Sequence, residues 1–337
     1  MNTNVSIVEV GTRRYRVRTG LAGSSKTPAI DFRATSHNPP GESKAKHGKS
    51  ERISLNIPRQ VHKYIIGPRG STLDKLRQES RAKITVPPER SRSDVVEIEG
   101  LLDERQKAEE LITQIVANNM AKVPYTHFIS LPLLDIDVQR KVGEFQRDAQ
   151  RILQNVDSSS FVHPGSLHIT LGMLRLLSPA DVTRAVEFLR SLAKEVAEIV
   201  STKPLLVSVG QLAAMEAASQ ARTIYAHADD FDNSGRLRRL CAFVRDKFDS
   251  AGYIDEKREL KIHVSVVRAK PASSPVNDED DLPKKGSRGF SVNAVPLLKE
   301  FGTMSFGVCR VGQIQIARRF RHAENGAYEN DGALSLL

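Results

Sequence analysis

Two short segments of this sequence repeat the same arrangement of side chains. LHITL at residues 167–171 and IHVSV at residues 262–266 each place a histidine two residues before a hydroxyl, between apolar residues. Because side chains alternate between the two faces of a β-strand, the imidazole and the hydroxyl of each segment share one face and the apolar residues share the other. We therefore expect two half-buried strands that each carry a histidine and a hydroxyl on the exposed side.

Two imidazoles beside two hydroxyls suit the chemistry of a phosphodiester. One imidazole can take a proton from an attacking hydroxyl or water while the other gives a proton to the leaving oxygen. The hydroxyls can hydrogen-bond the nonbridging oxygens as negative charge builds at phosphorus. We predict His168, Thr170, His263 and Ser265 as catalytic residues, with no metal ion and no other cofactor. The alternative is two unrelated strand histidines that lie beside hydroxyls by chance.

The repeated motif resembles the signature of the two-histidine (2H) phosphoesterase superfamily, which is a hydrophobic residue, His, any residue, Thr or Ser, and a hydrophobic residue, present twice. His168 and His263 are 95 positions apart in this chain. Within the superfamily, the sequence is most similar in type to the phosphoesterase domain of A-kinase anchor proteins. This resemblance implies two lobes of antiparallel sheet around a cleft that holds both histidines. Ser265 stands where threonine is commoner, but the hydroxyl is kept.

A second motif, GPRG at residues 67–70, lies between two predicted helices, VHKYII and STLDKLRQES, and we expect Ser71 to cap the second one. Two glycines allow the backbone to pass close to a sugar-phosphate chain, and Arg69 adds a cation. The N-terminus of the following helix points its dipole at phosphate. We predict that Gly67, Pro68, Arg69 and Gly70 bind nucleic acid. A plain turn in a protein-binding domain is the alternative.

Residues 52–121 as a whole read as strand, helix, helix, strand, strand, helix, and this order with the GPRG loop resembles a KH domain of the eukaryotic type (type I). KH domains clamp about four nucleotides of a single strand. The predicted partner is single-stranded RNA, with DNA as an alternative. Residues 51–124 hold thirteen basic and eleven acidic residues, so the affinity of this module for a polyanion should be modest.

Further alternating and helical patterns follow the KH-like segment. We expect a strand at THFISLPL, helices at 136–153 and 236–248, a single helix from Ser178 to Val200, a short helix near Leu297 and one final strand, GVCRVGQIQIAR. The fold class is α+β, with antiparallel strands. The predicted domains are a flexible basic tail at 1–50, the KH domain at 51–122, the 2H domain at 123–322 with a polar insert at 271–289, and a C-terminal tail at 323–337.

Composition restricts the possible partners. The chain of 337 residues carries 50 Lys or Arg against 40 Asp or Glu, a net charge of +10, and residues 1–50 hold nine basic and three acidic residues. A polyanionic partner is therefore the most plausible, with nucleic acid as the first candidate. The two cysteines, Cys241 and Cys309, are too few for a disulfide framework or a zinc site. No apolar run is long enough to span a membrane.

These patterns together predict an RNA-binding, metal-independent phosphodiesterase that cleaves or opens a 2′,3′-cyclic, 2′,5′ or 3′-end linkage. The family resemblance further implies a nuclear protein, with the cytoplasm as a second place, that joins a helicase-containing complex in transcription coactivation and in the response to DNA alkylation. The alternative function is a subunit that binds nucleic-acid ends or nucleotides without turnover.

Overall fold

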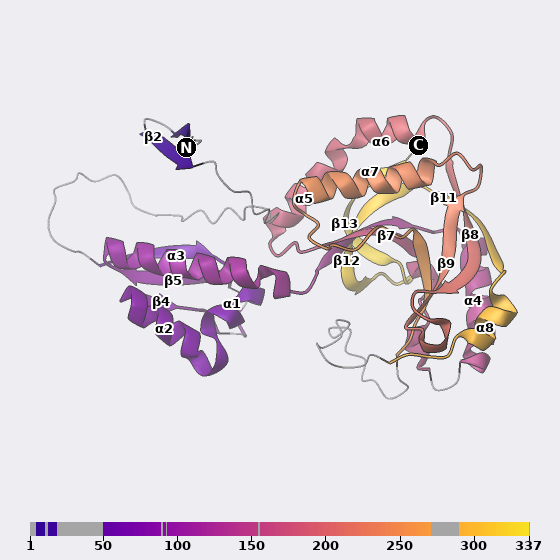
Figure 1. Cartoon of the computed structure of the whole chain (residues 1–337), viewed down its shortest axis with the longest axis horizontal. Helices are drawn as coiled ribbons and strands as arrows, with labels where there is room; N and C mark the ends of the chain where they lie inside the picture. The colour runs from indigo at the N-terminus through magenta and orange to yellow at the C-terminus, as the bar shows by residue number, and fades with distance from the viewer. Residues whose placement is uncertain are drawn as a thin grey trace, which may run out of the picture.

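A computed structural model describes residues 5–10, 13–18, 50–88, 90–91, 93–153, 156–270 and 290–336 (Figure 1). Near the N-terminus, strands β1 (Val5–Val10) and β2 (Arg13–Arg18) pair in an antiparallel hairpin. These residues are therefore paired strands, whereas we predicted a flexible tail over 1–50. The rest of that tail and the predicted insert at 271–289 lie outside the described residues.

The first globular domain has the KH order. It contains β3 (Glu51–Asn56), α1 (Arg59–Ile66), α2 (Ser71–Ser80), β4 (Lys83–Thr85), β5 (Val95–Gly100) and α3 (Leu102–Asn119). The sheet order is β3-β5-β4, and all pairs are antiparallel. Ile65, Ile84, Ile98 and Ile112 are fully buried in its core. The predicted type I KH fold is confirmed.

The second domain is built on an eight-stranded antiparallel sheet with the order β11-β8-β9-β10-β7-β6-β12-β13. Its strands are β6 (His127–Pro132), β7 (His168–Leu174), β8 (Leu205–Ala214), β9 (Thr223–Asp230), β10 (His263–Arg268), β11 (Ser305–Val311), β12 (Gln313–His322) and β13 (Tyr328–Ser335). Its helices are α4 (Ile136–Ile152), α5 (Pro179–Ser191), α6 (Ala193–Val200), α7 (Arg236–Ser250) and α8 (Val295–Phe301). Short 3-10 turns lie at Pro68–Gly70, Met120–Lys122, Ser158–Ser160, Pro164–Ser166 and Ala218–Gln220.

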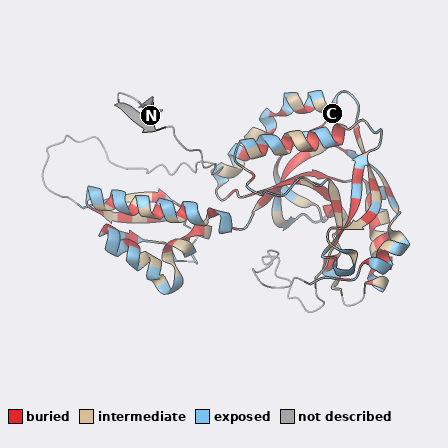
Figure 2. Ribbon diagram, in the orientation of Figure 1, coloured by how far each residue is buried: buried red, intermediate tan, exposed pale blue. Residues whose placement is uncertain are grey.

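The helices bury one side against the sheet and expose the other, as the alternating colours of Figure 2 show. In α4, for example, Val138, Val142, Phe145 and Ala149 are buried at helical spacing. Asp135 begins this helix because its side chain accepts hydrogen bonds from the Asp137 and Val138 backbone N–H groups. No helix in the described ranges is both long enough and apolar enough to cross a membrane.

The sheet consists of two halves of four strands each. Strands β11, β8, β9 and β10 form one half, and β7, β6, β12 and β13 form the other. Where the halves meet, β10 pairs with β7 at a single residue pair, Val264 and Ile169. The two predicted lobes are therefore confirmed, and each lobe contributes one histidine motif from the strand at the junction.

The sheet is curled, and the connection between β11 and β12 shows why. These strands belong to different halves, yet only Gly312 separates them in the chain. Since adjacent Cα atoms are about 3.8 Å apart, the two halves must come close at this point. The prediction of one continuous final strand over GVCRVGQIQIAR was wrong, because the chain passes from one lobe to the other in the middle of that apolar run.

Two other predicted boundaries change. Residues 323–337, expected as a C-terminal tail, contain β13, which pairs with β12 and completes the sheet. The helix expected from Ser178 to Val200 is two helices, α5 and α6, that meet at Leu192. Leu192 is 4% exposed, so a buried apolar residue stands at the break.

The two domains contact each other through a short connection. The Arg175 guanidinium donates hydrogen bonds to the carbonyl oxygens of Ala121 and Val123, which precede β6, and lies 4.0 Å from the Tyr125 ring centre. Arg175 also forms an ion pair with Asp255. Leu177, two residues further along, packs against the core of the KH domain. Residues 175–177 therefore hold the connection from the side of the second domain.

Candidate active site

The register of β10 on β7 brings the two histidine motifs together. Val264 and Ile169, which are paired, are both 0% exposed and face the core of the domain. Because neighbouring residues of a strand face opposite sides, the side chains of the four predicted catalytic residues lie together on the other face of the sheet, and the space in front of this face is called the cleft below. They are His168, Thr170, His263 and Ser265.

Both imidazoles are fixed in the same way. The Nδ1 atom of His168 lies 2.7 Å from the carbonyl oxygen of Ser166, and the Nδ1 atom of His263 lies 2.6 Å from that of Lys261. A carbonyl oxygen only accepts hydrogen bonds, so Nδ1 carries the proton in both rings. Among the described residues, neither Nε2 atom has a hydrogen-bond partner. Each neutral histidine therefore presents the Nε2 lone pair of a base.

Aromatic rings flank both histidines. His168 lies 5.0 Å from the ring centre of Phe128 and 5.2 Å from that of Tyr328, and His263 lies 5.4 Å from that of Tyr225. His168 is the more enclosed, at 8% exposure. Burial lowers the pKa of His168 to about 4 and also lowers the pKa of His263. Both histidines are therefore neutral at pH 7 before a substrate binds.

Arg268 is a further residue of this site, and sequence reasoning missed it. Strict alternation from His263 would turn residue 268 toward the core. A β-bulge between Ser265 and Val267 shifts the alternation, so that Arg268 pairs with Thr223 on the face where Ser265 pairs with Tyr225. The half-buried guanidinium makes no hydrogen bond or ion pair with the described residues, and its charge contributes to the lowered pKa values of both histidines.

The hydroxyls of Thr170 and Ser265 are also unengaged by side-chain hydrogen bonds within the described part of the chain. Together with Arg268, they give the cleft a cation and two donors beside the two imidazoles. A phosphate between the histidines would be held by charge and by hydrogen bonds that form without displacing any interaction seen here.

A partly buried ion pair lies beside β7 where β7 and β10 separate. The Arg245 guanidinium donates to the Leu171 carbonyl oxygen of β7 at 2.6 Å and forms an ion pair with Glu256 at 3.1 Å. The Glu256 carboxylate accepts from the Met173 backbone N–H. These contacts replace the strand hydrogen bonds that β10 does not supply, and they hold the first histidine motif in place.

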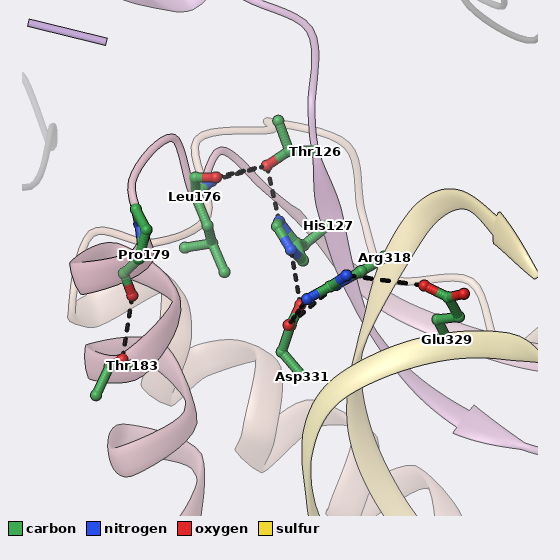
Figure 3. Close-up of polar contacts among 8 residues, drawn as sticks. All are labelled: Thr126, His127, Leu176, Pro179, Thr183, Arg318, Glu329 and Asp331. Atoms are coloured by element: carbon green, nitrogen blue, oxygen red, sulfur yellow. Dashed lines mark hydrogen bonds and ion pairs between the residues drawn. The ribbon is translucent and has the colours of Figure 1, made fainter. Parts of the chain in front are cut away.

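Another histidine of the same sheet has a different environment (Figure 3). His127 lies 2.8 Å from the Thr126 hydroxyl through Nδ1 and 3.0 Å from Asp331 through Nε2, and Arg318 forms an ion pair with the same carboxylate. His127 pairs with Leu174 on the core face of the sheet. With both ring nitrogens engaged and the ring 8% exposed, this histidine joins β6 to β13 and is not placed for proton transfer.

In the KH domain, the GPRG loop has the backbone that its glycines allow. Gly67 and Gly70 have φ values of 70° and 84°, and Arg69, between them, has φ of 53°. A Cβ at Gly67 would lie 2.0 Å from the Thr72 hydroxyl oxygen, so only glycine fits there. Arg69 is exposed. Gly70, rather than the predicted Ser71, is the N-cap of α2, and no side chain caps this helix. Its first N–H groups therefore remain available to a phosphate.

In the ranges that the structure describes, His, Cys, Asp and Glu side chains do not gather in groups of three or more that could hold a metal ion. Cys241 and Cys309 are both buried and unpaired.

Comparisons with known proteins agree with this two-domain organisation. Residues 52–114 match the KH domain family, and residues 125–336 match the family of the AKAP7 2'5' RNA ligase-like domain. Activating signal cointegrator 1 complex subunit 1 of Mus musculus is 28% identical over 298 residues, which cover 83% of this chain and 82% of the mouse protein.

Among solved structures, the first KH type I domain of human vigilin is 24% identical and covers 26% of this chain and 93% of its own, with a TM-score of 0.22. The protein TT0787 of Thermus thermophilus is 16% identical and covers 63% of this chain and 97% of its own, with a TM-score of 0.42. The family match over 125–336 takes in both histidine motifs and extends over well more than half of the sequence, so this chain belongs to the AKAP7 2'5' RNA ligase-like family and carries a KH domain in front.

Proposed function

We propose that this protein is a metal-independent phosphodiesterase that acts on single-stranded nucleic acid, with RNA as the first candidate substrate. The linkage it cleaves or opens is a 2′,3′-cyclic phosphate, a 2′,5′ link or a 3′ end. The observation that carries the proposal is the pair of Nε2 atoms without partners among the described residues, on one face of the sheet beside two hydroxyls and the Arg268 guanidinium.

In this mechanism His168 is the base and His263 is the acid. His168 is the more deeply buried and keeps the lower proton affinity, so it is neutral and accepts a proton through Nε2 from water or a hydroxyl. The oxygen so activated attacks phosphorus, and the bond to the leaving oxygen breaks. His263, protonated at Nε2, gives its proton to that oxygen.

Substrate binding prepares the acid. Desolvation lowers the pKa of His263 first, and the positive charges of Lys261, Arg268 and Arg258 lower it further. A bound phosphate offsets these charges and raises the pKa of His263 toward neutrality. Thr170, Ser265 and Arg268 then stabilise the charge on the nonbridging oxygens.

The KH domain holds the strand on which the second domain acts. Arg69 and the N-terminus of α2 contact the sugar-phosphate backbone, and Gly67, Pro68 and Gly70 shape the loop. The mouse relative is named as a subunit of the activating signal cointegrator 1 complex, and this similarity supports the proposal that the chain is a subunit of such a complex. On the family resemblance alone, we also propose helicase-containing partners, a location in the nucleus and also in the cytoplasm, and roles in transcription coactivation and in the response to DNA alkylation.

A second candidate function is binding of nucleic-acid ends or nucleotides without turnover, as a scaffold subunit of that complex. The observation that favours it is the enclosure of His168 between Phe128 and Tyr328. A ring held neutral in this way accepts a hydrogen bond at Nε2 from a sugar hydroxyl even where it transfers no proton.

The test incubates the purified protein and excess chelator with end-labelled single-stranded RNAs that carry a 2′,3′-cyclic phosphate, a 3′-hydroxyl or a 2′,5′ linkage. The His168→Ala/His263→Ala variant and a His127→Gln variant are run in parallel. Product from the wild type and the His127→Gln variant, and none from the double variant, would support the phosphodiesterase. Intact binding of RNA with no product from any protein would favour the scaffold.

A further inference from the structure

The carbonyl oxygen of Ser166 fixes the His168 ring, so the position of Ser166 decides how this ring is held. Ser166 lies before β7, in the 3-10 turn Pro164–Ser166. Its backbone N–H donates to the His163 carbonyl oxygen at 2.7 Å, and its own carbonyl oxygen accepts from the His168 Nδ1 atom at 2.7 Å. Both bonds are local in the chain, and a link to the rest of the sheet must come from the serine side chain.

The Ser166 side chain contacts the turn of residues 323–327 between β12 and β13, called the β12–β13 turn below. Ser166 is 3% exposed, and its hydroxyl donates to the carbonyl oxygen of Gly326, 160 positions later in the chain. The Nδ1 atom of His322 lies 3.2 Å from this hydroxyl and 3.2 Å from the same carbonyl oxygen. Since a carbonyl oxygen only accepts hydrogen bonds, Nδ1 of His322 carries the proton and donates.

The two turns meet backbone against backbone, and a glycine on each side permits this. A Cβ at Gly165 would lie 2.3 Å from the Asn325 carbonyl oxygen, and a Cβ at Gly326 would lie 2.0 Å from the His163 Nδ1 atom. The same Nδ1 atom accepts the Gly165 backbone N–H at 3.0 Å. Gly326 also has a φ of 79°, which favours glycine. The contact between the turns is therefore closely fitted.

The β12–β13 turn is itself held by hydrogen bonds. The Gly326 backbone N–H donates to the Ala323 carbonyl oxygen at 2.9 Å, and the Ala323 backbone N–H donates to the Ala327 carbonyl oxygen at 2.8 Å. His322 and Tyr328, which flank the turn, are paired across β12 and β13. The carbonyl oxygen that accepts from the serine hydroxyl therefore has a fixed position relative to the sheet.

From these contacts we propose that the β12–β13 turn positions His168, because it holds Ser166 so that the serine carbonyl oxygen keeps the imidazole proton on Nδ1 and Nε2 free. Ser166, Gly326 and His322 are positioning residues, since they act through His168. The inference rests on the proposed function, which makes His168 the base. It gives β13 a role in the reaction besides completing the sheet.

The first experiment observes the ring directly, so that it does not depend on turnover. The full-length protein with 15N-labelled imidazoles is studied by NMR at about pH 8, above the ordinary pKa of histidine. We expect His168 of the wild type to carry its proton on Nδ1. In Ser166→Ala the ratio of the Nδ1–H to the Nε2–H tautomer should fall about tenfold, which is the effect of one lost hydrogen bond. His263, held by the Lys261 carbonyl oxygen, is the internal reference and should not change.

The matched control is Ser160→Ala. Ser160 is 0% exposed, lies in the 3-10 turn Ser158–Ser160 of the same domain, and bonds the backbone of a distant residue. Its hydroxyl donates to the Lys270 carbonyl oxygen at 3.3 Å and accepts from the Lys270 backbone N–H at 2.8 Å. The tautomer ratio of His168 should stay at the wild-type value. An equal fall in the two serine variants would indicate a general loosening of the domain and would overturn the inference.

An unchanged tautomer ratio in Ser166→Ala would also overturn it. Because Ser166 is buried, a second variant covers the case in which Ser166→Ala does not fold. His322 is exposed, and His322→Ala removes one of the two partners of the serine hydroxyl. We expect a several-fold fall of the His168 tautomer ratio in this variant, and a wild-type ratio would contradict the role of the turn.

The second experiment measures steady-state rates on the RNA linkages. Ser166→Ala should lower kcat at least about tenfold, because a misplaced base reacts slowly. KM should stay within about threefold, since Thr170, Ser265 and Arg268 still contact the phosphate. A raised KM with an unchanged kcat would contradict a role in positioning the base.

The two proposals fail separately. A changed tautomer ratio in Ser166→Ala, without product from the wild type on any RNA, would contradict the proposed function alone. Product from the wild type, with an unchanged tautomer ratio in Ser166→Ala, would contradict the positioning role alone.

Discussion

His168 and His127 lie on neighbouring strands of one sheet and have the same exposure, 8%, but their surroundings differ. His127 faces the core and uses both ring nitrogens, with Thr126 on one side and Asp331 on the other. His168 faces the cleft and uses only Nδ1, to a carbonyl oxygen. The comparison teaches that burial alone does not distinguish a structural histidine from a reactive one. The two kinds of histidine are distinguished by the number of ring nitrogens that make hydrogen bonds and by the face of the sheet on which the ring lies.

The largest expected effect separates the two kinds of histidine by activity. His168→Ala or His263→Ala should each lower kcat roughly 10²- to 10⁴-fold, because each removes one proton-transfer group. His127→Gln should leave kcat within about threefold of the wild type, since His127 does not reach the cleft. Steady-state rates on whichever of the three RNA linkages the wild type cleaves would check this. A His127→Gln rate as low as that of His168→Ala would remove the distinction.

For the free energy of unfolding, in contrast to activity, the surroundings of His127 should matter, and Asp331 is the residue that tests this. Asp331→Ala should lower the free energy of unfolding by about 3 kcal/mol, because it leaves His127 and Arg318 without their shared partner. Chemical denaturation followed by tyrosine fluorescence would measure it. Glu324→Ala, an exposed acidic position near β13, is the control and should change little. Equal losses in the two variants would show that the network adds no stability.

The pH dependence of stability should sharpen the contrast further. The pKa of His168 falls from 6.5 to about 4 on folding. The unfolded chain therefore takes up a proton as the pH falls through 6.5, while the folded protein does so only near pH 4. Stability is lost across that window, about 2 kcal/mol of it between pH 7 and pH 5. Between pH 7 and pH 5, the free energy of unfolding of His168→Gln should fall by about 2 kcal/mol less than that of the wild type, as parallel denaturation curves would measure. Identical pH dependence in the two proteins would contradict the low proton affinity of His168.

The smallest expected effect concerns Arg268. Arg268→Ala should weaken substrate binding about tenfold, since it removes one phosphate contact. It should also raise the pKa of both His168 and His263. The pKa of His127, which lies on the opposite face of the sheet, should not change. NMR titration of the three imidazoles would report both changes in a single experiment. A shift of the His127 resonances as large as those of His168 would indicate a structural effect rather than a local charge.

Much of the cleft could be predicted from the sequence. The alternation of His168 and Thr170 with Ile169 and Leu171 already determines which side chains share a face, because the period of a strand is two residues. The spacing of Gly67 and Gly70 between two amphipathic helices likewise determined the KH loop. Both patterns are local, so they needed no knowledge of what packs around them.

Other features were decided only by tertiary structure. The bulge after Ser265 brings Arg268 into the cleft, and no local pattern marks it. The break at Gly312 sends β11 and β12 into different lobes although their sequence reads as one strand, and β13 extends the sheet through residues that are mostly polar. The sequence by itself determined the two motifs and the faces on which they lie. Three features depend on contacts between segments that are distant in the chain: the pairing of Val264 with Ile169, the side of the sheet to which Arg268 turns, and the enclosure of His168. These contacts form only when the whole sheet has folded.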